Sequence, residues 1–519
     1  MPLKIFDTTL RDGSQSPDVN YTIRDKIKIA SALDSFGVDY IELGWPGSNL
    51  KDREAFKEAS LLGFKNKVVA FGSTRRKGIK PEEDGNLKEI IESKAKAACI
   101  FGKTWLTHIE KQLMITPEEN LASIKESISF LKKKRLSVFY DLEHFFDGFK
   151  DNKKYALECI KTAAAAGADY LVMCDTNGGC LPDEISLIIK ETKAYMARNR
   201  IKTELGIHCH NDSGMAVPNT LAAIELGVTQ LHMTVNGFGE RTGNADLCLI
   251  LPILIIKKRI KMPKIKLDKL TELSKIVYEL ANLKPNDHQP FVGKNAFRHK
   301  GGVHVDALMK GASYEHMNPL LVGNKQSIVL SELSGKANIV EIAKKYGYDV
   351  NKEDIRVKEM LAKVEEMEKK GYDIGDIPAE QYLLVERFFG KKKEIFKINT
   401  WRIMSEHRNG EYSECVITGS VDDKQREVVA PVNGGPVDAV YRSLQKMIAT
   451  NYKEIKEVTL VDYKVMIAEE SGAGSSVRVY VEFKHNDEEW GCVGVSGNIL
   501  EASLMAIEKG FKYFMLRNF

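Results

Sequence analysis

The sequence has no hydrophobic run long enough to cross a membrane. Of its 519 residues, 43% are hydrophobic and 29% are charged. No stretch approaches the roughly 18 to 20 apolar residues that a spanning helix requires. The chain opens directly with a short apolar run, Leu3 to Phe6, so we expect neither a signal peptide nor a transit peptide. We therefore predict a protein without a membrane partner.

Paired cysteines and an excess of one charge are also missing. The eight cysteines are scattered and form no Cys-x-x-Cys pair, so disulfides are not indicated and a reducing cytoplasm is the simplest interpretation. The 76 basic and 72 acidic residues nearly cancel, and no basic block stands out, which argues against a nucleic-acid partner. The length is sufficient for two to four domains.

Residues 3 to about 260 alternate short apolar runs with amphipathic stretches. Eight strand–helix units in about 260 residues are typical of a (β/α)8 TIM barrel, an α/β fold. In that fold, chemistry occurs where the strands end and the βα loops begin. We assign the barrel to residues 1–260. Its strands are expected to begin near Lys4, Val38, Lys67, Lys96, Leu136, Tyr170, Thr203 and Gln230.

One helix start in this region carries a recognisable capping pattern. In Thr116-Pro117-Glu118-Glu119, Thr116 suits the N-cap, Pro117 suits the first helical position, and Glu119 suits the reciprocal position of a capping box.

Two charged residues follow the first predicted strand. Asp12 offers a hard oxygen ligand to a metal, and Arg11 can bind a carboxylate or a developing alkoxide. Taken alone, the pair is equally consistent with solvated surface.

A His-x-His segment ends the seventh predicted strand. Residues i and i+2 of a strand share a face, so His208 and His210 point the same way and Cys209 points to the other side. Two imidazoles plus a carboxylate predict a divalent-metal site with open positions, although a lone His-x-His is more often without function. Barrel closure makes strands 1, 7 and 8 neighbours, and Asn244 follows strand 8, which supports the metal interpretation.

Other predicted strands also end in polar side chains. The barrel mouth is where catalytic groups gather, and hydrogen bonding within the mouth is the alternative role for each of these residues. They are Glu42, Asp141, Glu143 and Thr176.

Three segments together resemble one enzyme family. They are Asp7 to Gly13, His208 to Asp212 and Gly239 to Asn244, in that order. They resemble the acyl-CoA-condensing synthases that include 2-isopropylmalate, homocitrate and citramalate synthases. The resemblance implies a Claisen condensation of acetyl-CoA, as co-substrate, with a 2-oxo acid, followed by thioester hydrolysis. It also implies a divalent metal, Mg, Mn or Zn.

The resemblance implies roles for individual residues. The metal ligands would be Asp12, His208 and His210, with Asn244 close by. Arg11 would stabilise the alkoxide and, with Thr176, bind substrate. A linker histidine and tyrosine complete the family's active site, and the matching residues are His304 and Tyr314, with Glu143 in support of the proton relay. The local sequence Gly302-Val303-His304-Val305-Asp306 lacks the glutamine that the family usually has after the histidine.

The choice of 2-oxo acid follows from finer resemblance. The segments at residues 44–49, 140–148 and 175–179 resemble the citramalate branch, which implies pyruvate as acceptor and a place on the route to isoleucine. The alternatives are 2-isopropylmalate synthase, then homocitrate synthase. An alternative from another class is a non-catalytic amino-acid sensor with a decayed barrel. Against it argue five intact residues, namely Arg11, Asp12, His208, His210 and His304.

The remainder of the chain changes character twice. Residues 261–400 are mainly helical in pattern and are predicted to form linker subdomains. Residues 401–519 alternate like strands and hold two Gly-rich turns before helices, which indicates two related strand-and-helix units. They resemble the family's regulatory domain, which implies a homodimer that binds an allosteric amino acid, here isoleucine, at the domain interface. Candidate regulatory residues are Gly435, Pro436, Asp438 and Asn498.

Overall fold

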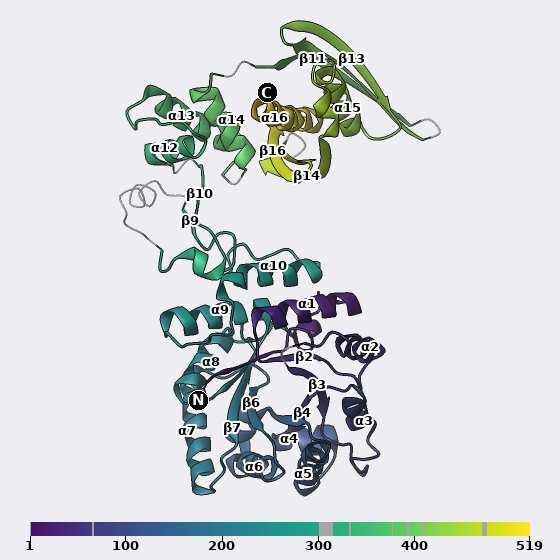
Figure 1. The fold of residues 1–519 in the computed structure, drawn as a ribbon, viewed down its shortest axis with the longest axis vertical. Coiled ribbons are helices and arrows are strands. Elements are labelled where there is room, and N and C mark those ends of the chain that lie inside the picture. Colours follow the sequence, from purple (N-terminus) through teal and green to yellow (C-terminus); the bar gives the residue numbers. More distant parts are fainter. Residues whose placement is uncertain are drawn as a thin grey trace. The chain divides into compact units, whose positions relative to one another are not determined.

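The computed structural model divides into two compact units (Figure 1). Unit 1 comprises Met1–Phe297 and Met317–Lys325, and unit 2 comprises Arg298–His316 and Gln326–Phe519. His304 and Tyr314 lie outside the described residues. The structure describes residues 2–64, 67–299, 315–331, 334–375, 377–391, 394–407, 410–469 and 475–519.

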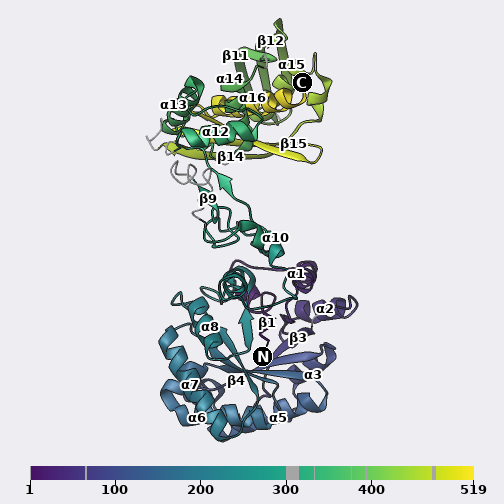
Figure 2. The same ribbon diagram turned by 60° about the vertical axis from the view of Figure 1, so that its left-hand side comes forward.

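Eight parallel strands form a closed barrel in unit 1, with helices in a ring outside them (Figure 2). The first strand pairs with the last, which closes the barrel. The predicted TIM barrel is confirmed, and every strand begins within two residues of its expected start. The strands are β1 Lys4–Asp7, β2 Tyr40–Gly44, β3 Lys67–Ser73, β4 Ala97–Lys103, β5 Ser137–Glu143, β6 Tyr170–Asp175, β7 Glu204–Cys209 and β8 Gln230–Met233.

The outer helices bury one apolar face against the strands, as amphipathic helices around a barrel must. The principal helices are α1 Ile23–Phe36, α2 Leu50–Ala59, α3 Gly85–Glu92, α5 Pro117–Lys133, α6 Phe145–Ala165, α7 Pro182–Arg198 and α8 Ala216–Glu225. After the barrel come α9 Leu247–Pro252 and α10 Leu270–Leu280. Short turns of helix are η1 Gly13–Gln15, α4 Leu106–His108, η2 Ile109–Leu113, η3 Val235–Gly237, η4 Ile253–Lys257, η5 Leu267–Lys269 and η6 Pro319–Val322.

The start of α5 confirms half of the predicted capping pattern. The Thr116 hydroxyl accepts the backbone N–H of Glu119 at 3.2 Å, and Pro117 occupies the first helical position. The reciprocal bond was predicted wrongly, because the Glu119 carboxylate accepts a hydrogen bond from Arg75 at 2.9 Å instead. A long-range guanidinium partner gives a charge-assisted bond, which the local pattern does not reveal.

Unit 2 begins with a helical layer. Its helices are α12 Lys336–Lys345, α13 Ile355–Lys369 and α14 Pro378–Phe389, beside a two-stranded pair, β9 Arg298–His299 and β10 Ser327–Ile328. The apolar stripe predicted for α13 is confirmed, since Met360, Val364 and Met367 are all buried in one cluster. The charged residues of α13 occupy its other faces.

The C-terminal part of unit 2 repeats one motif twice. Each copy is a three-stranded antiparallel sheet followed by a helix, and the two helices share one hydrophobic cluster. The two predicted strand-and-helix units are therefore present. The first copy is β11 Phe396–His407, β12 Glu411–Val421, β13 Lys424–Val432 and α15 Pro436–Ile448. After η7 Lys453–Glu457, the second is β14 Thr459–Glu469, β15 Ser476–His485, β16 Glu488–Ser496 and α16 Ile499–Asn518.

All eight cysteines are buried and unpaired. Burial raises the pKa of the Cys99, Cys209 and Cys492 thiols well above the ordinary value. In the part of the chain that the structure describes, no helix has the length and apolarity needed to cross a membrane.

Candidate functional site

Three predicted ligands converge at the C-terminal edge of the barrel. Asp12 Oδ2 lies 3.3 Å from His208 Nε2 and 3.8 Å from His210 Nε2, and the two Nε2 atoms are 3.3 Å apart. All three side chains are buried, and one ligand atom from each lies within 4.8 Å of the others. The strand register explains this, because β1 and β7 both pair with β8. The arrangement is compatible with a single cation bound to all three.

The protonation states of this cluster also suit a cation. Burial opposes the charge on Asp12, but Arg11 and the two histidines outweigh it and hold the pKa of the carboxyl well below its usual value. Burial lowers the pKa of His210 to about 4. His208 also lowers this pKa, whereas the Asp12 carboxylate raises it. Near neutral pH the site therefore presents a carboxylate and a neutral His210 imidazole, which are the metal-binding forms.

Several polar atoms at the cluster have no hydrogen-bond partner within the described residues. They are Asp12 Oδ1, His210 Nδ1 and Asn244 Oδ1, all buried. Asn244 and His210 form a β-bridge, which brings the amide to the cluster. Leaving a buried acceptor unpaired costs about 1–3 kcal/mol, and a cation would satisfy the two oxygens. The residues present therefore fit a divalent metal.

The loop that carries Asn244 is fixed by its glycines and by Arg241. A Cβ on Gly243, whose φ is +94°, would lie 1.9 Å from the Gly237 carbonyl oxygen, so only glycine fits this approach. Arg241 donates to both oxygens of Asp212, at 2.6 and 2.8 Å. These contacts join the loop after β8 to the loop after β7 and place Asn244 next to His210.

Arg11 is held in a fixed orientation beside the cluster. Its Nε donates to Glu42 Oε2 at 2.6 Å, and Nη1 donates to Asp12 Oδ2 at 3.0 Å. The guanidinium lies over the Phe71 ring, 3.8 Å from its centroid. Burial opposes its charge, but Glu42, Asp12 and Asp141 outweigh that effect and raise the pKa of Arg11. Nη2 forms no hydrogen bond within the described residues, so it remains available to an oxyanion. Glu42 is thus a structural partner of Arg11.

Glu143 and Thr176 lie at the same edge but contact other groups. Glu143, the last residue of β5, forms an ion pair with Lys103 at 2.7 Å. The Thr176 hydroxyl, just after β6, accepts the backbone N–H of His144 at 2.8 Å. Neither side chain is bonded to the Asp12 cluster in the described residues.

The candidate regulatory residues surround the two helix starts of unit 2. Gly435 is the N-cap of α15 and Pro436 is its first residue, while Asp438 pairs with Arg442 at 3.0 Å. Asn498 Oδ1 accepts the backbone N–H of Leu500 at 2.9 Å and caps α16. The positions thus have local structural roles.

Sequence reasoning missed a third histidine at the cluster. His232 Nδ1 lies 3.4 Å from His208 Nδ1, and its ring stacks on Phe6 with centroids 3.9 Å apart. Burial lowers the pKa of His232 well below its usual value, and His208 adds to the effect. The available signal was strand alternation, because Gln230 and His232 share a face of β8 and polar residues there point into the barrel.

An aromatic wall adjoins Arg11 and was also missed. Phe71 and Phe101 stack with centroids 5.5 Å apart, and Trp45 meets both rings edge-on at 5.5 and 5.7 Å. Trp45 is anchored by its indole N–H, which donates to Asn86 at 2.6 Å. Because β2, β3 and β4 are adjacent, these rings form one apolar surface beside the guanidinium.

Comparison with known proteins matches three segments of the chain to families. Residues 2–277 match the family described as HMGL-like. Residues 291–372 match the homocitrate synthase post-HMGL domain-like family, and residues 377–515 match the LeuA allosteric (dimerisation) domain. The fold and the site thus define a TIM-barrel enzyme class, and the chain belongs to the HMGL-like family.

Relatives that match nearly the whole chain show which enzymes of this class it resembles most. The chain is 43% identical to the (R)-citramalate synthase of Aquifex aeolicus, over 99% of this chain and 98% of that protein. It is 44% identical to the (R)-citramalate synthase of Geobacter sulfurreducens, over 98% and 97%. Identity to the 2-isopropylmalate synthase of Methanocaldococcus jannaschii is 31%, over 99% and 95%. The similarity is therefore greater to the citramalate branch.

Proposed function

We propose that this protein is an (R)-citramalate synthase. It condenses acetyl-CoA with pyruvate and hydrolyses the thioester, releasing (R)-citramalate and CoA. The observation that carries the proposal is the buried Asp12–His208–His210 cluster beside Arg11, in a chain 39–44% identical to five (R)-citramalate synthases.

A divalent metal would be held by Asp12, His208 and His210, with the Asn244 amide oxygen close by. When bound, it supplies Lewis-acid polarisation of the 2-oxo acid carbonyl. The mixed nitrogen and oxygen donors are compatible with Mg, Mn or Zn. The unpaired Asp12 Oδ1 and Asn244 Oδ1 support this assignment.

Arg11 would bind the oxygen that gains charge during condensation. Its Nη2 is free of protein partners among the described residues, while Glu42, Asp12 and the Phe71 ring fix the other faces of the guanidinium. A donor that is already oriented stabilises a developing alkoxide without reorganisation. Thr176 would contribute to substrate binding from the adjacent part of the barrel mouth.

The proton steps need a general base and water. A base removes a proton from the acetyl methyl group, the resulting carbon attacks C2 of pyruvate, and the carbonyl oxygen becomes an alkoxide that is then protonated. Water subsequently adds to the thioester and CoA leaves as the thiol. We assign the base relay to His304 with Tyr314 on grounds of family resemblance, with Glu143 in support.

The aromatic wall provides a steric basis for the choice of acceptor. A hydrophobic pocket distinguishes substrates that differ by one methylene only about 10- to 200-fold, so rejection of a branched acid needs a rigid obstacle. Trp45, Phe71 and Phe101 pack against one another, and Asn86 accepts the indole N–H of Trp45, which makes these rings a stiff surface. We infer that they leave room for the methyl group of pyruvate and oppose the isopropyl group of 2-oxoisovalerate.

The test is thiol release from acetyl-CoA, measured with a panel of 2-oxo acids. We expect the highest kcat/KM with pyruvate. A higher value with 2-oxoisovalerate would assign the chain to 2-isopropylmalate synthase, and no release with any acid would favour a sensor. In Phe101→Ala, which leaves Arg11 and Phe71 unsubstituted, the ratio of 2-oxoisovalerate to pyruvate activity should rise, whereas Phe130→Ala outside the wall should not change it.

We further propose a division of labour along the chain. Residues 1–260 catalyse the reaction, residues 261–400 form a linker that carries His304 and Tyr314, and residues 401–519 form the regulatory domain of a homodimer. The match of residues 377–515 to the LeuA allosteric (dimerisation) domain supports the last assignment. Isoleucine is the proposed effector, because citramalate would lead towards it.

A further inference from the structure

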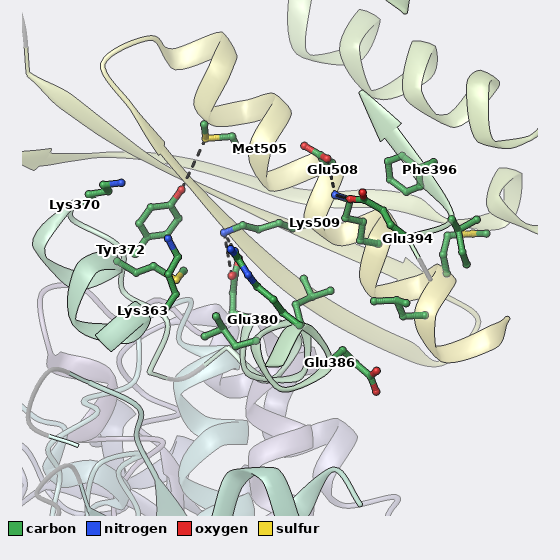
Figure 3. Close-up of a pocket in the computed structure, with 18 residues that line it drawn as sticks. Lys363, Lys370, Tyr372, Glu380, Glu386, Glu394, Phe396, Met505, Glu508 and Lys509 are labelled. Carbon is green, nitrogen blue, oxygen red and sulfur yellow. Dashed lines mark hydrogen bonds and ion pairs between the residues drawn. The ribbon is translucent and has the colours of Figure 1, made fainter. Parts of the chain in front are cut away.

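A cavity of about 590 Å³ lies within unit 2, between α13, α14, α16 and the start of β11 (Figure 3). Its volume falls in the range of about 300–1,000 Å³ that is usual for small-molecule sites. No residue proposed for the active site lines it, and neither do the candidate regulatory residues at the two Gly-rich turns. Apolar side chains such as Met367, Leu384, Met505 and Met515 form much of its wall.

Most of the cations around the cavity are already neutralised by carboxylates. Lys509 Nζ lies 3.0 Å from Glu380 Oε2 and also donates to the Val493 carbonyl oxygen at 2.7 Å. Lys512 pairs with Glu394 at 2.6 Å and with Glu508 at 2.9 Å. Each of these ammonium groups therefore has an internal partner and little need of a ligand.

Lys363 of α13 and Lys370, which directly follows that helix, are also paired. Lys363 and Lys370 both approach Glu366, at 2.8 and 2.6 Å. Helical spacing accounts for this, since residues three and four apart lie on one face of a helix.

Arg387 differs from these four lysines. It lines the cavity and its side chain is exposed, yet among the described residues it forms no ion pair or hydrogen bond. Its guanidinium lies 5.9 Å from the centroid of the Phe388 ring. A guanidinium presents a planar pair of donors that matches a carboxylate. Within the described part of the chain, Arg387 therefore lines the cavity without a protein ion-pair partner, and its guanidinium is of the type that binds carboxylates.

Among the described residues, no neighbouring carboxylate forms an ion pair with Arg387. Figure 3 shows the Glu386 carboxylate directed away from the Glu380–Lys509 pair, and Glu386 Oε1 accepts the Tyr348 hydroxyl at 3.0 Å. Tyr372 also lines the cavity. Its hydroxyl donates to the Met505 sulfur at 3.9 Å, which is a weak acceptor. Tyr372 thus offers a second donor to an incoming anion.

We propose that this cavity binds a small amphipathic carboxylate. The carboxylate pairs with Arg387, and the hydrocarbon part lies against Met367, Leu384 and Met505. Glu380 is already paired with Lys509 and accepts the backbone N–H of Val493, so this carboxylate offers no place for the ammonium group of an amino acid. The site joins α13 and α14 to α16, so its occupant would stabilise the packing of the helical layer on the second repeat.

The test uses calorimetry on the full-length protein with a series of unbranched and branched monocarboxylates from butanoate to decanoate, including 4-methylpentanoate. The matched probe 4-methylpentanamide has the same shape without the charge. We expect the acid to bind more tightly than the amide. Because a charge-assisted bidentate pair is lost, Arg387→Gln should weaken binding of the acid about tenfold to a hundredfold and leave binding of the amide unchanged.

Three controls separate this site from others. Arg356→Gln removes an exposed guanidinium of α13 that pairs with Asp354 and does not line the cavity, so it should bind the acid like the wild type. Arg11→Gln should also retain binding, which excludes the barrel site. Retained thiol release and an unchanged far-UV circular dichroism spectrum in Arg387→Gln would show that the variant is folded.

Several results would overturn the proposal. They are binding of no member of the series, equal binding of acid and amide by the wild type, and an acid affinity that is the same in Arg387→Gln as in the wild type. Tighter binding of leucine or isoleucine that does not depend on Arg387 would instead place amino-acid binding elsewhere in the protein. Because thiol release is measured separately, failure here leaves the proposed reaction intact.

Discussion

Asp12 has contacts on one oxygen only, as far as the described residues show. Oδ2 receives Arg11 Nη1 at 3.0 Å and lies within 3.8 Å of both imidazoles, whereas Oδ1 is buried without a donor. A purely structural buried carboxylate would have hydrogen bonds to both of its oxygens. The unpaired Oδ1 therefore indicates that Asp12 is placed to bind a cation.

Asp12→Ala should therefore abolish turnover and leave the barrel folded. Metal bound per chain, measured by elemental analysis after reconstitution and dialysis, should fall together with thiol release. Asp18→Ala changes an exposed aspartate of the same loop and serves as the matched control. Full activity and full metal content in Asp12→Ala would end the metal assignment.

His304→Ala should slow condensation while pyruvate still binds. Base catalysis typically contributes about 100- to 10,000-fold, so kcat should fall within that range with little change in KM for pyruvate. His288→Ala, at an exposed histidine hydrogen-bonded to Asn295, is the control. Wild-type turnover in His304→Ala would mean that the histidine has no part in the proton relay.

At the scale of elements, the periodicity of the sequence predicts those features that depend only on residues close together in the chain. Strand starts and the shared face of His208 and His210 follow from alternation, and they are confirmed. The contact of His232 with His208 and the stacking of Phe71 on Phe101 depend on register between strands. Register is set by packing around the whole barrel, so no single segment reveals these contacts. For the same reason, the local capping pattern does not reveal the bond from Arg75 to Glu119.

Strand β1 ends on a carboxyl group that opposes folding at neutral pH. Burial raises the pKa of Asp7 to about 7, against the hydrogen bonds from Thr9 that favour the anion. An unfolded aspartate titrates near 3.9, so between about pH 4 and pH 7 the folded state binds the extra proton. The free energy of unfolding should therefore fall as the pH rises through this window.

Asp7→Asn removes that titration and keeps the shape of the protonated acid. The free energy of unfolding of Asp7→Asn minus that of the wild type should therefore increase as the pH rises. The increase should be up to about 4 kcal/mol, since each pKa unit corresponds to about 1.4 kcal/mol. Urea unfolding at a series of pH values measures the difference, with the exposed Asp18→Asn as control. A difference that stays constant with pH would refute the assignment of a protonated Asp7.

Helices α14 and α16 are joined by a pair of charges in an apolar surrounding. Glu380 is 2% exposed and meets Lys509 at 3.0 Å. Removing one member of a buried pair is more damaging than replacing both. We expect Glu380→Gln to lower the free energy of unfolding by about 2 kcal/mol or more, and the double variant Glu380→Gln with Lys509→Met to recover part of this loss. A double variant less stable than the single one would contradict this account.

At the scale of the whole molecule, the proposed regulation would link the two compact units. Isoleucine should inhibit the full chain through residues 401–519, and coupling of about 1–3 kcal/mol corresponds to several-fold to about a hundredfold inhibition. Inhibition of thiol release and calorimetry with isoleucine, with leucine as comparison, test this. Tighter leucine binding would favour the isopropylmalate alternative, and no binding of either would refute the regulatory role.

Removing residues 401–519 is a less suitable test of isoleucine inhibition than a point substitution. Ala379 of α14 belongs to the same hydrophobic cluster as α15 and α16, so removing residues 401–519 would expose a buried helix face. We expect loss of isoleucine sensitivity but also a lower midpoint of thermal unfolding. Asp438→Ala and Asn498→Ala in the full chain are the better variants, and unchanged isoleucine sensitivity in both would exclude the Gly-rich turns as the binding site.

The burial of all eight thiols makes the folded protein silent to thiol reagents. A colorimetric disulfide reagent can then follow CoA release without a signal from the enzyme's own thiols. A slow reaction of the enzyme alone with this reagent would report local opening of the fold. The same property permits site-directed labelling without removing any native cysteine. Cysteines introduced at Leu61 and Ile355, which are 85% and 63% exposed and lie in different units, would be the only two fast-reacting positions. A pair of fluorophores there would measure how the distance between the units changes when an effector binds.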